Sequence, residues 1–515
     1  MSILKIENLS QRYGDKVLYQ ETGLELNAHE HVGLIGENGA GKSTLIEIAR
    51  GEMEPDGGKV FWQAETKVGY LDQYAKLDGE VTILEYIQNV HKELYKVARQ
   101  VEKDLAQIEK VYDEKLLQRI LREQQILSEN NFVAKEVQGR KVTAGLGLAA
   151  LGWERKAREM SGGQRAKLLL AKLLLENPDV LLLDEPTNFL DKEHIDWLAE
   201  YLHKFAGAIL LISHDTDFLD KVVEQVTALE GGKIRKYKGN YTAYKKQKAL
   251  EKVTQSRAYD KQQKLIAKTQ DYIARNGVRT ATARQAQSRQ KMLDKIQLIA
   301  PPENKKKLPW RFASGPAVGG KALTVQDLIV GYEKPLLPPL NLEIRAGEKI
   351  AIIGFNGIGK STLLKTLLGE IPALGGKGRF AEGTTVNYFE QELKWMDPRM
   401  TPIQIVWESY PDLTQSEVRA KLAQSGVKKD LVNSRIASLS GGEQTKVKMA
   451  KMMLRRSNFL ILDEPTNHLD VVAKESLQRA IAEFVGTVIL VSHEESFYAP
   501  IVEKVHNLQF DQSLL

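Results

Sequence analysis

The chain has 515 residues, 42% of them hydrophobic and 27% charged, with no cysteine and a formal net charge of +6. Domains usually hold roughly 100–200 residues, so this length excludes a single small binding module and predicts two or three domains. The composition excludes global disorder, and the lack of cysteine excludes disulfide scaffolds, Cys-ligated zinc and a thiol nucleophile.

The N-terminal segment lacks the basic stretch and apolar core of a signal peptide. No apolar run approaches the roughly 20 residues that a membrane-spanning helix needs. We therefore expect a cytoplasmic protein that does not enter a membrane.

The first segment that indicates a chemistry is an apolar strand over residues 31–35, followed by the pattern GxxxxGK[ST] and a helix over residues 43–49. Glycines in such a loop let backbone N–H groups surround a polyphosphate, and the helix N-terminus favours negative charge. Lys42 would neutralise the β- and γ-phosphates, and Ser43 would bind Mg²⁺. The residues predicted to contact the polyphosphate of a nucleotide are Gly36, Glu37, Asn38, Gly39, Ala40, Gly41, Lys42, Ser43 and Thr44.

A helical arm is predicted over about residues 88–140, where apolar side chains recur at steps of three and four with charges between them. Residues 91–140 contain ten basic and nine acidic residues, so the arm is nearly neutral. We expect a helical hairpin that projects from the first domain. A solvated helix pair without a function of its own is the alternative interpretation.

The apolar strand over residues 180–183 ends in two adjacent carboxylates. Asp184 is placed to complete the Mg²⁺ environment, and Glu185 to polarise an attacking water. The first part of the chain therefore predicts a magnesium-dependent site for nucleotide hydrolysis.

Residues 241–300 form a linker with no proline and one glycine, Gly277, which predicts two long helices joined by a turn at residues 276–279. A first helix over residues 245–275 would be roughly 45 Å long. The linker carries fourteen basic and four acidic residues, so its net charge is +10 (14 − 4) and the rest of the chain carries −4 (6 − 10). A merely solvated hairpin usually mixes both signs, so this concentration favours a contact with nucleic acid. The basic and Gly-rich segment 305–320 predicts a flexible connection to the next domain.

The motifs of the first domain recur in the last part of the chain. The phosphate-binding pattern returns 318 residues later, and the paired carboxylates return as Asp463 and Glu464 at an offset of 279. The first copy therefore carries 39 extra residues (318 − 279), in the region of the arm. The second set of residues predicted to contact ATP is Gly354, Phe355, Asn356, Gly357, Ile358, Gly359, Lys360, Ser361 and Thr362.

Each copy also has an LSGG-like signature upstream of its paired carboxylates, at residues 160–164 and 439–443. With the phosphate-binding loops, these motifs resemble two complete ABC-type ATPase cassettes, named here cassette one (1–240) and cassette two (321–515). The resemblance implies an α/β fold class. Two P-loop ATPase domains would be joined by a long helical hairpin linker (241–310), with the helical arm inserted in the first domain.

The resemblance also implies roles for individual residues. The implied catalytic residues are Gln73, Gln391, Glu185, Glu464, His214 and His493. The implied Mg²⁺ ligands are Ser43, Gln73, Asp184, Ser361, Gln391 and Asp463. The further implied ATP contacts are the adenine-stacking aromatics Tyr13 and Tyr332 and the signature residues Ser161, Gly162, Gly163, Ser440, Gly441 and Gly442.

Paired ABC cassettes close head-to-tail, so the resemblance implies two composite sites. Lys42 would share one site with Ser440, and Lys360 the other with Ser161. Because both cassettes lie in one chain and neither has lost a motif, we expect a monomer with two hydrolysing sites. Phe189 stands where the family commonly has His, and Thr216 stands where it frequently has Arg, so the two sites can differ.

Three features make the chain similar to the ABC-F subfamily in particular: the arm, the basic linker, and the sequence GNYTAY at residues 239–244. The segment AQSRQK at residues 286–291 is also similar to that family's second linker helix. The resemblance covers essentially the whole chain. It implies a soluble ATPase that binds ribosomal RNA at the E site and brings its linker tip to the P-site tRNA near the peptidyl-transferase centre. The expected RNA-contact residues are Arg275, Asn276, Gly277, Val278, Arg279, Arg284 and Arg289.

Several alternatives stay open at this point. The chain could be the tandem ATPase subunit of a sugar importer, although that function leaves the +10 linker unexplained. It could also be a DNA-repair ATPase whose linker binds DNA. Within ABC-F, the sequence does not separate a translation factor from a factor that protects ribosomes from an antibiotic, and we favour the translation factor. ATP rather than GTP is inferred only from the family.

Overall fold

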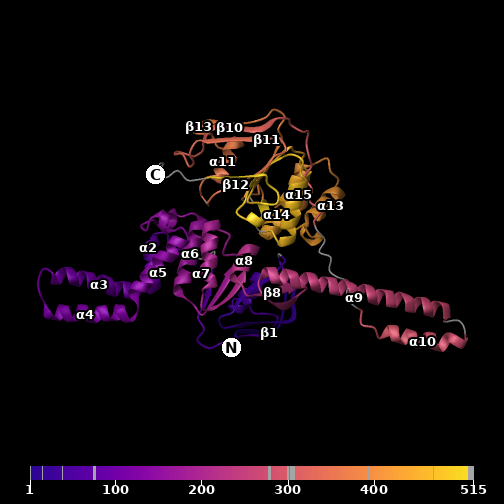
Figure 1. The fold of residues 1–515 in the computed structure, drawn as a ribbon, viewed down its shortest axis with the longest axis horizontal. Coiled ribbons are helices and arrows are strands. Elements are labelled where there is room, and N and C mark those ends of the chain that lie inside the picture. Colours follow the sequence, from indigo (N-terminus) through magenta and orange to yellow (C-terminus); the bar gives the residue numbers. More distant parts are fainter. Residues whose placement is uncertain are drawn as a thin grey trace.

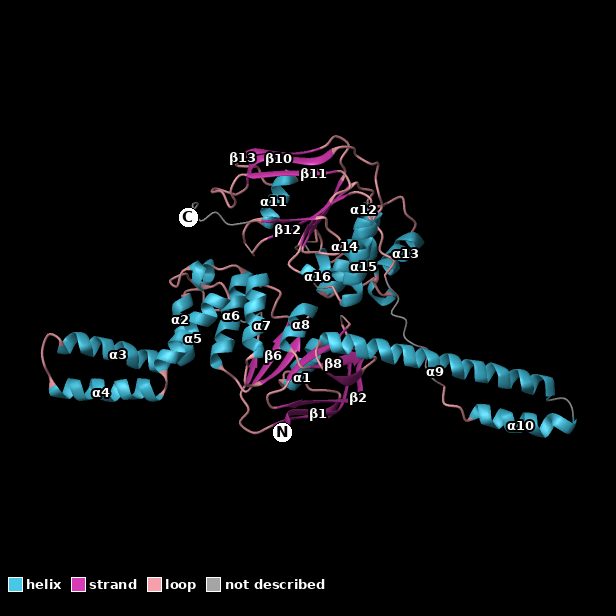
Figure 2. Cartoon of the chain, viewed as in Figure 1, coloured by secondary structure: helices cyan, strands magenta, loops and turns pink. Residues whose placement is uncertain are grey.

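The computed structural model describes residues 2–13, 16–37, 39–72, 77–276, 280–298, 301, 308–355, 357–391, 395–467 and 469–508. Two α/β units contain most of the described residues, and two helical projections extend from cassette one in opposite directions (Figure 1). Each unit combines a mainly or wholly parallel sheet with a smaller antiparallel sheet (Figure 2). The predicted α/β fold class is therefore confirmed.

Cassette one contains nine strands and eight helices among its described residues. The strands are β1 (Ser2–Tyr13), β2 (Lys16–Asn27), β3 (His31–Gly36), β4 (Gly57–Trp62), β5 (Val68–Tyr70), β6 (Val180–Asp184), β7 (Ala208–Ile212), β8 (Gln225–Glu230) and β9 (Lys233–Lys238). The helices are α1 (Lys42–Ala49), α2 (Ile83–Gln88), α3 (Lys92–Ile108), α4 (Glu114–Glu129), α5 (Phe132–Gly145), α6 (Gly162–Glu176), α7 (Lys192–His203) and α8 (Thr216–Val222).

The central sheet of cassette one has the strand order β5-β6-β7-β3-β8-β9, and only β9 runs antiparallel to its neighbour. Every residue of β7 is buried, as a parallel strand covered on both faces requires. The carboxyl ends of parallel strands meet at one edge of a sheet. The loops after β3, β6 and β7 therefore bring the phosphate-binding loop, the paired carboxylates and His214 to the same edge.

The arm is the antiparallel pair of α3 and α4, which extends from cassette one (Figure 1). Val101, Leu116 and Ile120 form a small core between the two helices. Asp104 is buried there, and its carboxylate accepts a hydrogen bond of 2.6 Å from Nε of Arg119. A buried carboxylate needs such a partner, so this ion pair fixes how the two helices pack.

The first linker helix, α9 (Tyr241–Asn276), has 36 residues and extends away from both cassettes, beside α10 (Thr280–Asp294). At about 1.5 Å per residue α9 is roughly 54 Å long. It begins four residues before the predicted start at residue 245, because the Asn240 side chain accepts a hydrogen bond of 3.1 Å from the backbone N–H of Ala243. Tyr241 and Tyr244 in the first turn are buried in the core of cassette one. The predicted turn continues through residues 277–279, which lie outside the described residues.

Cassette two repeats the arrangement without the arm. Its described strands are β10 (Lys321–Ile329), β11 (Leu340–Arg345), β12 (Lys349–Ile353), β13 (Gly375–Phe380), β14 (Val386–Phe389), β15 (Phe459–Asp463), β16 (Thr487–Val491) and β17 (Lys504–Asn507). Its described helices are α11 (Lys360–Leu367), α12 (Pro402–Ser409), α13 (Gln415–Ser425), α14 (Gly441–Leu454), α15 (Val471–Glu483) and α16 (Glu495–Tyr498). The parallel sheet has the order β14-β15-β16-β12-β17.

The packed core of cassette two begins earlier than residue 321, where the sequence places its start. Trp310 and Phe312 are 2% and 4% exposed and belong to the cluster around α15. The indole N–H of Trp310 donates a hydrogen bond of 3.2 Å to the carbonyl of Ser425. The sequence does not reveal that Trp310 and Phe312 belong to this core, because they follow a basic segment and two aromatic residues alone give no periodic pattern.

Candidate nucleotide sites

The phosphate-binding loop of cassette one curls around its own lysine. Lys42 is buried, and its ammonium donates hydrogen bonds of 2.9 Å and 3.1 Å to the carbonyls of Gly36 and Glu37. Gly41 has a φ of 106°, a left-handed conformation that suits glycine, and its carbonyl accepts a hydrogen bond from the Tyr19 hydroxyl. These bonds hold the loop against the start of α1. The first N–H groups of α1 have no partner within the helix, so they can bind the phosphates of a nucleotide.

Cassette two builds the same loop with one addition. The Lys360 ammonium donates to the carbonyls of Gly354 and Phe355 at 2.7 Å and 3.2 Å, and it also lies 2.9 Å from Nε2 of His493. Burial, followed by the charge of Lys360, lowers the pKa of His493 to about 4. His493 is therefore neutral at pH 7, so its Nε2 can accept the hydrogen bond from Lys360.

The two predicted catalytic glutamates share an unusual backbone. Glu185 and Glu464 have φ values of 49° and 48°, in the left-handed region that side chains rarely adopt. Their backbone N–H groups donate to the carbonyls of Ile212 and Val491 at 2.9 Å and 3.0 Å, which holds the residues in this conformation. The same conformation at two equivalent positions gives both glutamates the same placement at the end of their strands.

Each glutamate carboxylate lies beside the histidine of its own cassette. The His214 backbone N–H donates a hydrogen bond of 3.2 Å to Oε2 of Glu185. In cassette two, Nε2 of His493 lies 3.1 Å from Oε1 of Glu464. Burial raises the pKa of both carboxyls to about 8. With this pKa the carboxyl is mostly protonated at pH 7, and it is the ionised form that can take a proton from an attacking water as a general base.

The proposed Mg²⁺ ligands fit a divalent cation. Burial raises the pKa of Asp184 and Asp463, while the hydroxyls of Ser43 and Ser361 lower it. Both carboxylate oxygens of Asp463 are buried without a donor at good hydrogen-bond geometry. The described residues contain no cluster of three or more His, Cys, Asp or Glu side chains that could hold a metal. This donor set suits Mg²⁺, which takes one or two protein ligands and completes its shell with phosphate and water.

One cavity joins the two cassettes. Its volume is 430 Å³, and it is lined by Lys42 and Ser43 of cassette one together with Ser440, Gly441 and Gly442 of cassette two. Ser440 is the N-cap of α14, so that helix presents its N-terminus to the cavity. Lys42 and Ser440 thus lie at one site, the arrangement that head-to-tail pairing predicts.

The second predicted site is built differently. A cavity of 600 Å³ beside the loop of cassette two is lined by Gly354, Phe355 and His493, together with Asp191 and Lys192 of cassette one. Ser161, the N-cap of α6, is exposed and is not among the residues that line this cavity. The pairing of Lys360 with Ser161 therefore stays a prediction.

The remaining predicted residues lie as follows. Tyr13 and Tyr332 are 72% and 67% exposed, which leaves their rings accessible for stacking. Gln391 lines the cavity that holds Lys42 and also a third, smaller cavity of 150 Å³, which is lined by Lys360, Ser361, Asp463 and Glu464. The residues Asn38, Gln73, Gly277, Val278, Arg279 and Asn356 lie outside the described residues, as does the side chain of Asn276.

Sequence reasoning missed several residues of one cassette that act on the nucleotide site of the other. Asp191 is the N-cap of α7, and Asp470 is the N-cap of α15. Burial lowers the pKa of Lys360 and of Lys42. The charge of Asp191 raises the pKa of Lys360, and the charge of Asp470 raises that of Lys42, each by less than burial lowers it. Both aspartates end a PTN-x-LD sequence at the same offset of 279, so the repeat itself could have found them. Lys474 also reaches the opposite cassette, and no repeated signal marks it.

The charge of the linker lies on its surface. Thirteen of its fourteen basic residues are described, and all of these except Lys248 are exposed. Lys248 pairs with Glu230, which holds the first turns of α9 to cassette one. Arg289 stacks on Tyr272 at 3.6 Å from the ring centre and joins α10 to α9. The exposed basic groups remain available to an anionic partner.

Comparison with known proteins identifies the family. A model described as "ABC transporter" matches residues 19–188 and 337–467, and a second model with the same description matches residues 227–312, across the linker. The chain is 42% identical to the uncharacterized ABC transporter ATP-binding protein YfmM of Bacillus subtilis, over 99% of each chain. It is 37% identical to ABC transporter F family member 2 of Arabidopsis thaliana, over 98% of this chain and 76% of the relative.

The chain belongs to the ABC-F family. Its two ABC domains make it an ATPase. The fold is also shared with the structure described as ribosome-bound archaeal Pelota and ABCE1, with a TM-score of 0.60 and 20% identity over 98% of this chain and 76% of that chain. None of the helices in the described part of this ABC-F chain is long and apolar enough to cross a membrane.

Proposed function

We propose that this ABC-F ATPase binds the ribosome when ATP closes its cassettes, and that hydrolysis releases it. In this proposal it works in the cytoplasm as a monomer. It occupies the E site and its linker acts on the P-site tRNA near the peptidyl-transferase centre. The single observation that supports the proposal most strongly is the basic surface of α9 and α10, which extends away from both cassettes (Figure 1).

A ribosomal surface is the partner whose chemistry suits this linker. RNA offers a dense row of phosphates, and exposed Lys and Arg side chains displace their counterions. Arg275, Arg284 and Arg289 lie toward the far end of the linker, where α9 ends and α10 begins. Arg275 pairs with Asp271 at 3.0 Å, and its side chain is 76% exposed, so its guanidinium is accessible to a phosphate.

The switch follows from the composite cavity. An ATP held by Lys42 would present its γ-phosphate to the N-terminus of α14, which carries Ser440. Mg²⁺ would be held by Ser43 and Asp184 and would neutralise phosphate charge. Loss of the γ-phosphate removes the group that both cassettes bind, so the cassettes separate.

The double variant Glu185→Gln and Glu464→Gln tests the proposal. Gln keeps the shape of each side chain and removes the general base, so ATP should stay bound and the cassettes should stay closed. With ATP and Mg²⁺ the variant should sediment with ribosomes, whereas with ADP, or with ATP and EDTA, it should remain in the supernatant. A variant that binds ATP but stays off ribosomes contradicts the proposal.

The same preparation separates the other interpretations. Copurification with a membrane permease would support the importer ATPase, which gives the basic linker no role. A complex that survives ribonuclease and is released by deoxyribonuclease would support a DNA-binding ATPase. Cryo-EM of the trapped ribosome would show the tRNA beside residues 275–289 and the distance from them to any antibiotic site.

A further inference from the structure

The loop after β7 controls the position of Glu185. Its central residue, His214, donates its backbone N–H to Oε2 of Glu185 at 3.2 Å, and its Nε2 lies 3.5 Å from Oε1. The next residue, Asp215, accepts hydrogen bonds of 3.0 Å from the N–H groups of Asp217 and Phe218 and so begins α8. A shift of the His214 backbone would therefore move the carboxylate that faces the attacking water.

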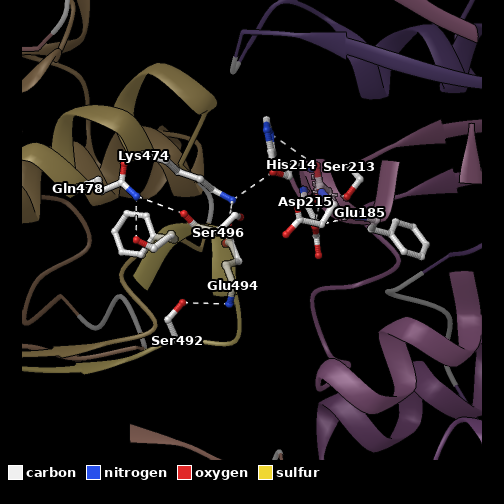
Figure 3. Close-up of polar contacts among 12 residues, drawn as sticks. Glu185, Ser213, His214, Asp215, Lys474, Gln478, Ser492, Glu494 and Ser496 are labelled. Carbon is white, nitrogen blue, oxygen red and sulfur yellow. Dashed lines mark hydrogen bonds and ion pairs between the residues drawn. The ribbon is translucent and has the colours of Figure 1, made fainter. Parts of the chain in front are cut away.

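A lysine of cassette two holds this loop. Lys474, on α15, donates a hydrogen bond of 3.2 Å to the backbone carbonyl of His214 (Figure 3). Its ammonium also donates to both carboxylate oxygens of Glu494 at 2.8 Å, which orients it toward cassette one. These bonds use the donor capacity of the ammonium, and the side chain is only 12% exposed. Lys474, Glu185 and His214 line the same cavity as Lys42 and Ser440.

The other nucleotide site has no equivalent lysine. The repeat offset of 279 relates Lys474 to Ile195, whose side chain has no donor, and relates His214 to His493. Beside His493 the cassettes are joined instead by the ion pair of Lys192 with Glu495. Both of these side chains are more than half exposed, so the pair contributes little to holding the loop.

We propose that Lys474 is a positioning residue for ATP hydrolysis at the site shared by Lys42 and Ser440, and that it acts from the opposite cassette. Because its partner lies across the interface, the bond to His214 forms only when the cassettes approach. Closure thereby sets the His214 loop and Glu185 at this site, whereas the site of Lys360 and Glu464 is set within cassette two. The proposal rests on the ATPase activity and does not depend on ribosome binding.

Turnover in two single-site backgrounds tests this role. Glu464→Gln leaves hydrolysis to Glu185, and Glu185→Gln leaves it to Glu464. Adding Lys474→Met should lower kcat about tenfold in the first background with little change in KM. In the second background kcat should change less than about twofold. An equal fall in both backgrounds, or none in the first, overturns the proposal.

Matched variants separate positioning from general damage. Lys474→Arg keeps a cation and its donors and should retain most of the activity. Lys321→Met removes an exposed lysine of cassette two that pairs with Glu343 on the antiparallel sheet and lines neither site, so it should leave kcat nearly unchanged in both backgrounds. If Lys321→Met matches the effect of Lys474→Met in the Glu464→Gln background, the proposal fails.

Hydrogen exchange gives a readout that does not depend on turnover. In the ATP-bound double variant Glu185→Gln and Glu464→Gln, the amides of residues 213–216 should be protected. Adding Lys474→Met should speed their exchange about tenfold and leave the amides of α4 in the arm unchanged, because the bonds of Lys474 go to His214 and Glu494. Unchanged exchange at residues 213–216 would show that Lys474 does not hold the loop.

Discussion

At the scale of single residues, the two glutamates predicted to be catalytic share a left-handed backbone conformation. Glu185 and Glu464 each follow a buried strand, and each is tied by its N–H to the strand beside it. The strain places a carboxyl next to a histidine and keeps it buried, which raises its pKa to about 8. The repeat spacing predicts both residues, but their pKa values depend on burial, which spacing does not report.

Trp310 offers a residue-scale prediction for the anchor of cassette two. Replacing this buried indole by Ala should destabilise cassette two by about 3–5 kcal/mol, because it removes a large core side chain and leaves a cavity. Scanning calorimetry should show a lower transition temperature for cassette two and an unchanged one for cassette one. Trp407→Ala, at a position 40% exposed, is the control and should have a smaller effect. Equal effects would contradict the anchoring role.

At the scale of elements, the linker begins with a long helix whose first turn is fixed to cassette one. Tyr241 and Tyr244 are buried in cassette one, and Asp220 of α8 accepts a hydrogen bond of 2.7 Å from the backbone N–H of Thr242. The helix that begins at the His214 loop therefore contacts the first turn of α9. The described basic residues of the linker after Lys248 are exposed, so their charge can be changed without disturbing the packing of the cassettes.

The linker charge leads to a prediction at the element scale. Changing Lys252, Lys261 and Lys268 to Gln should weaken ribosome binding by the trapped double variant and reduce its dependence on salt. Each lost phosphate contact lowers the slope of log affinity against log salt by about 0.7–0.9. Sedimentation with ribosomes over a series of KCl concentrations measures both effects.

A control with the same charge change identifies the surface. Lys59, Lys377 and Lys429 are exposed on the two cassettes, and their change to Gln removes three charges far from the linker. This variant should keep the salt slope of the parent. If both triple variants lose affinity equally, net charge rather than the linker determines binding.

At the scale of the whole molecule, Lys42 of cassette one and Ser440 of cassette two line the same cavity, which gives a prediction about pairs of variants. Ser440→Arg fills the site of Lys42, so combining it with Lys42→Met should lower kcat no further than either change alone. Head-to-tail pairing places Ser161 at the site of Lys360, so on that prediction Ser161→Arg combined with Lys42→Met should abolish hydrolysis by disabling both sites. Steady-state ATPase rates measure this non-additivity. Additive loss in the first pair would contradict head-to-tail pairing of Lys42 with Ser440.

The sequence by itself determined the two cassettes, their catalytic motifs, the arm and the charge of the linker. These features are local or repeated, so spacing and composition report them directly. It missed Trp310 as the start of a core, Lys474 as a contact between the cassettes, and Asp191 and Asp470 as charges that act on the lysine of the opposite cassette. Only the tertiary structure decided these, because each depends on side chains brought together across hundreds of residues. The same cause explains why the two sites differ. Their motifs are the same, but the His214 loop accepts a hydrogen bond from Lys474 of the opposite cassette, whereas the equivalent position in cassette one is Ile195, which has no donor.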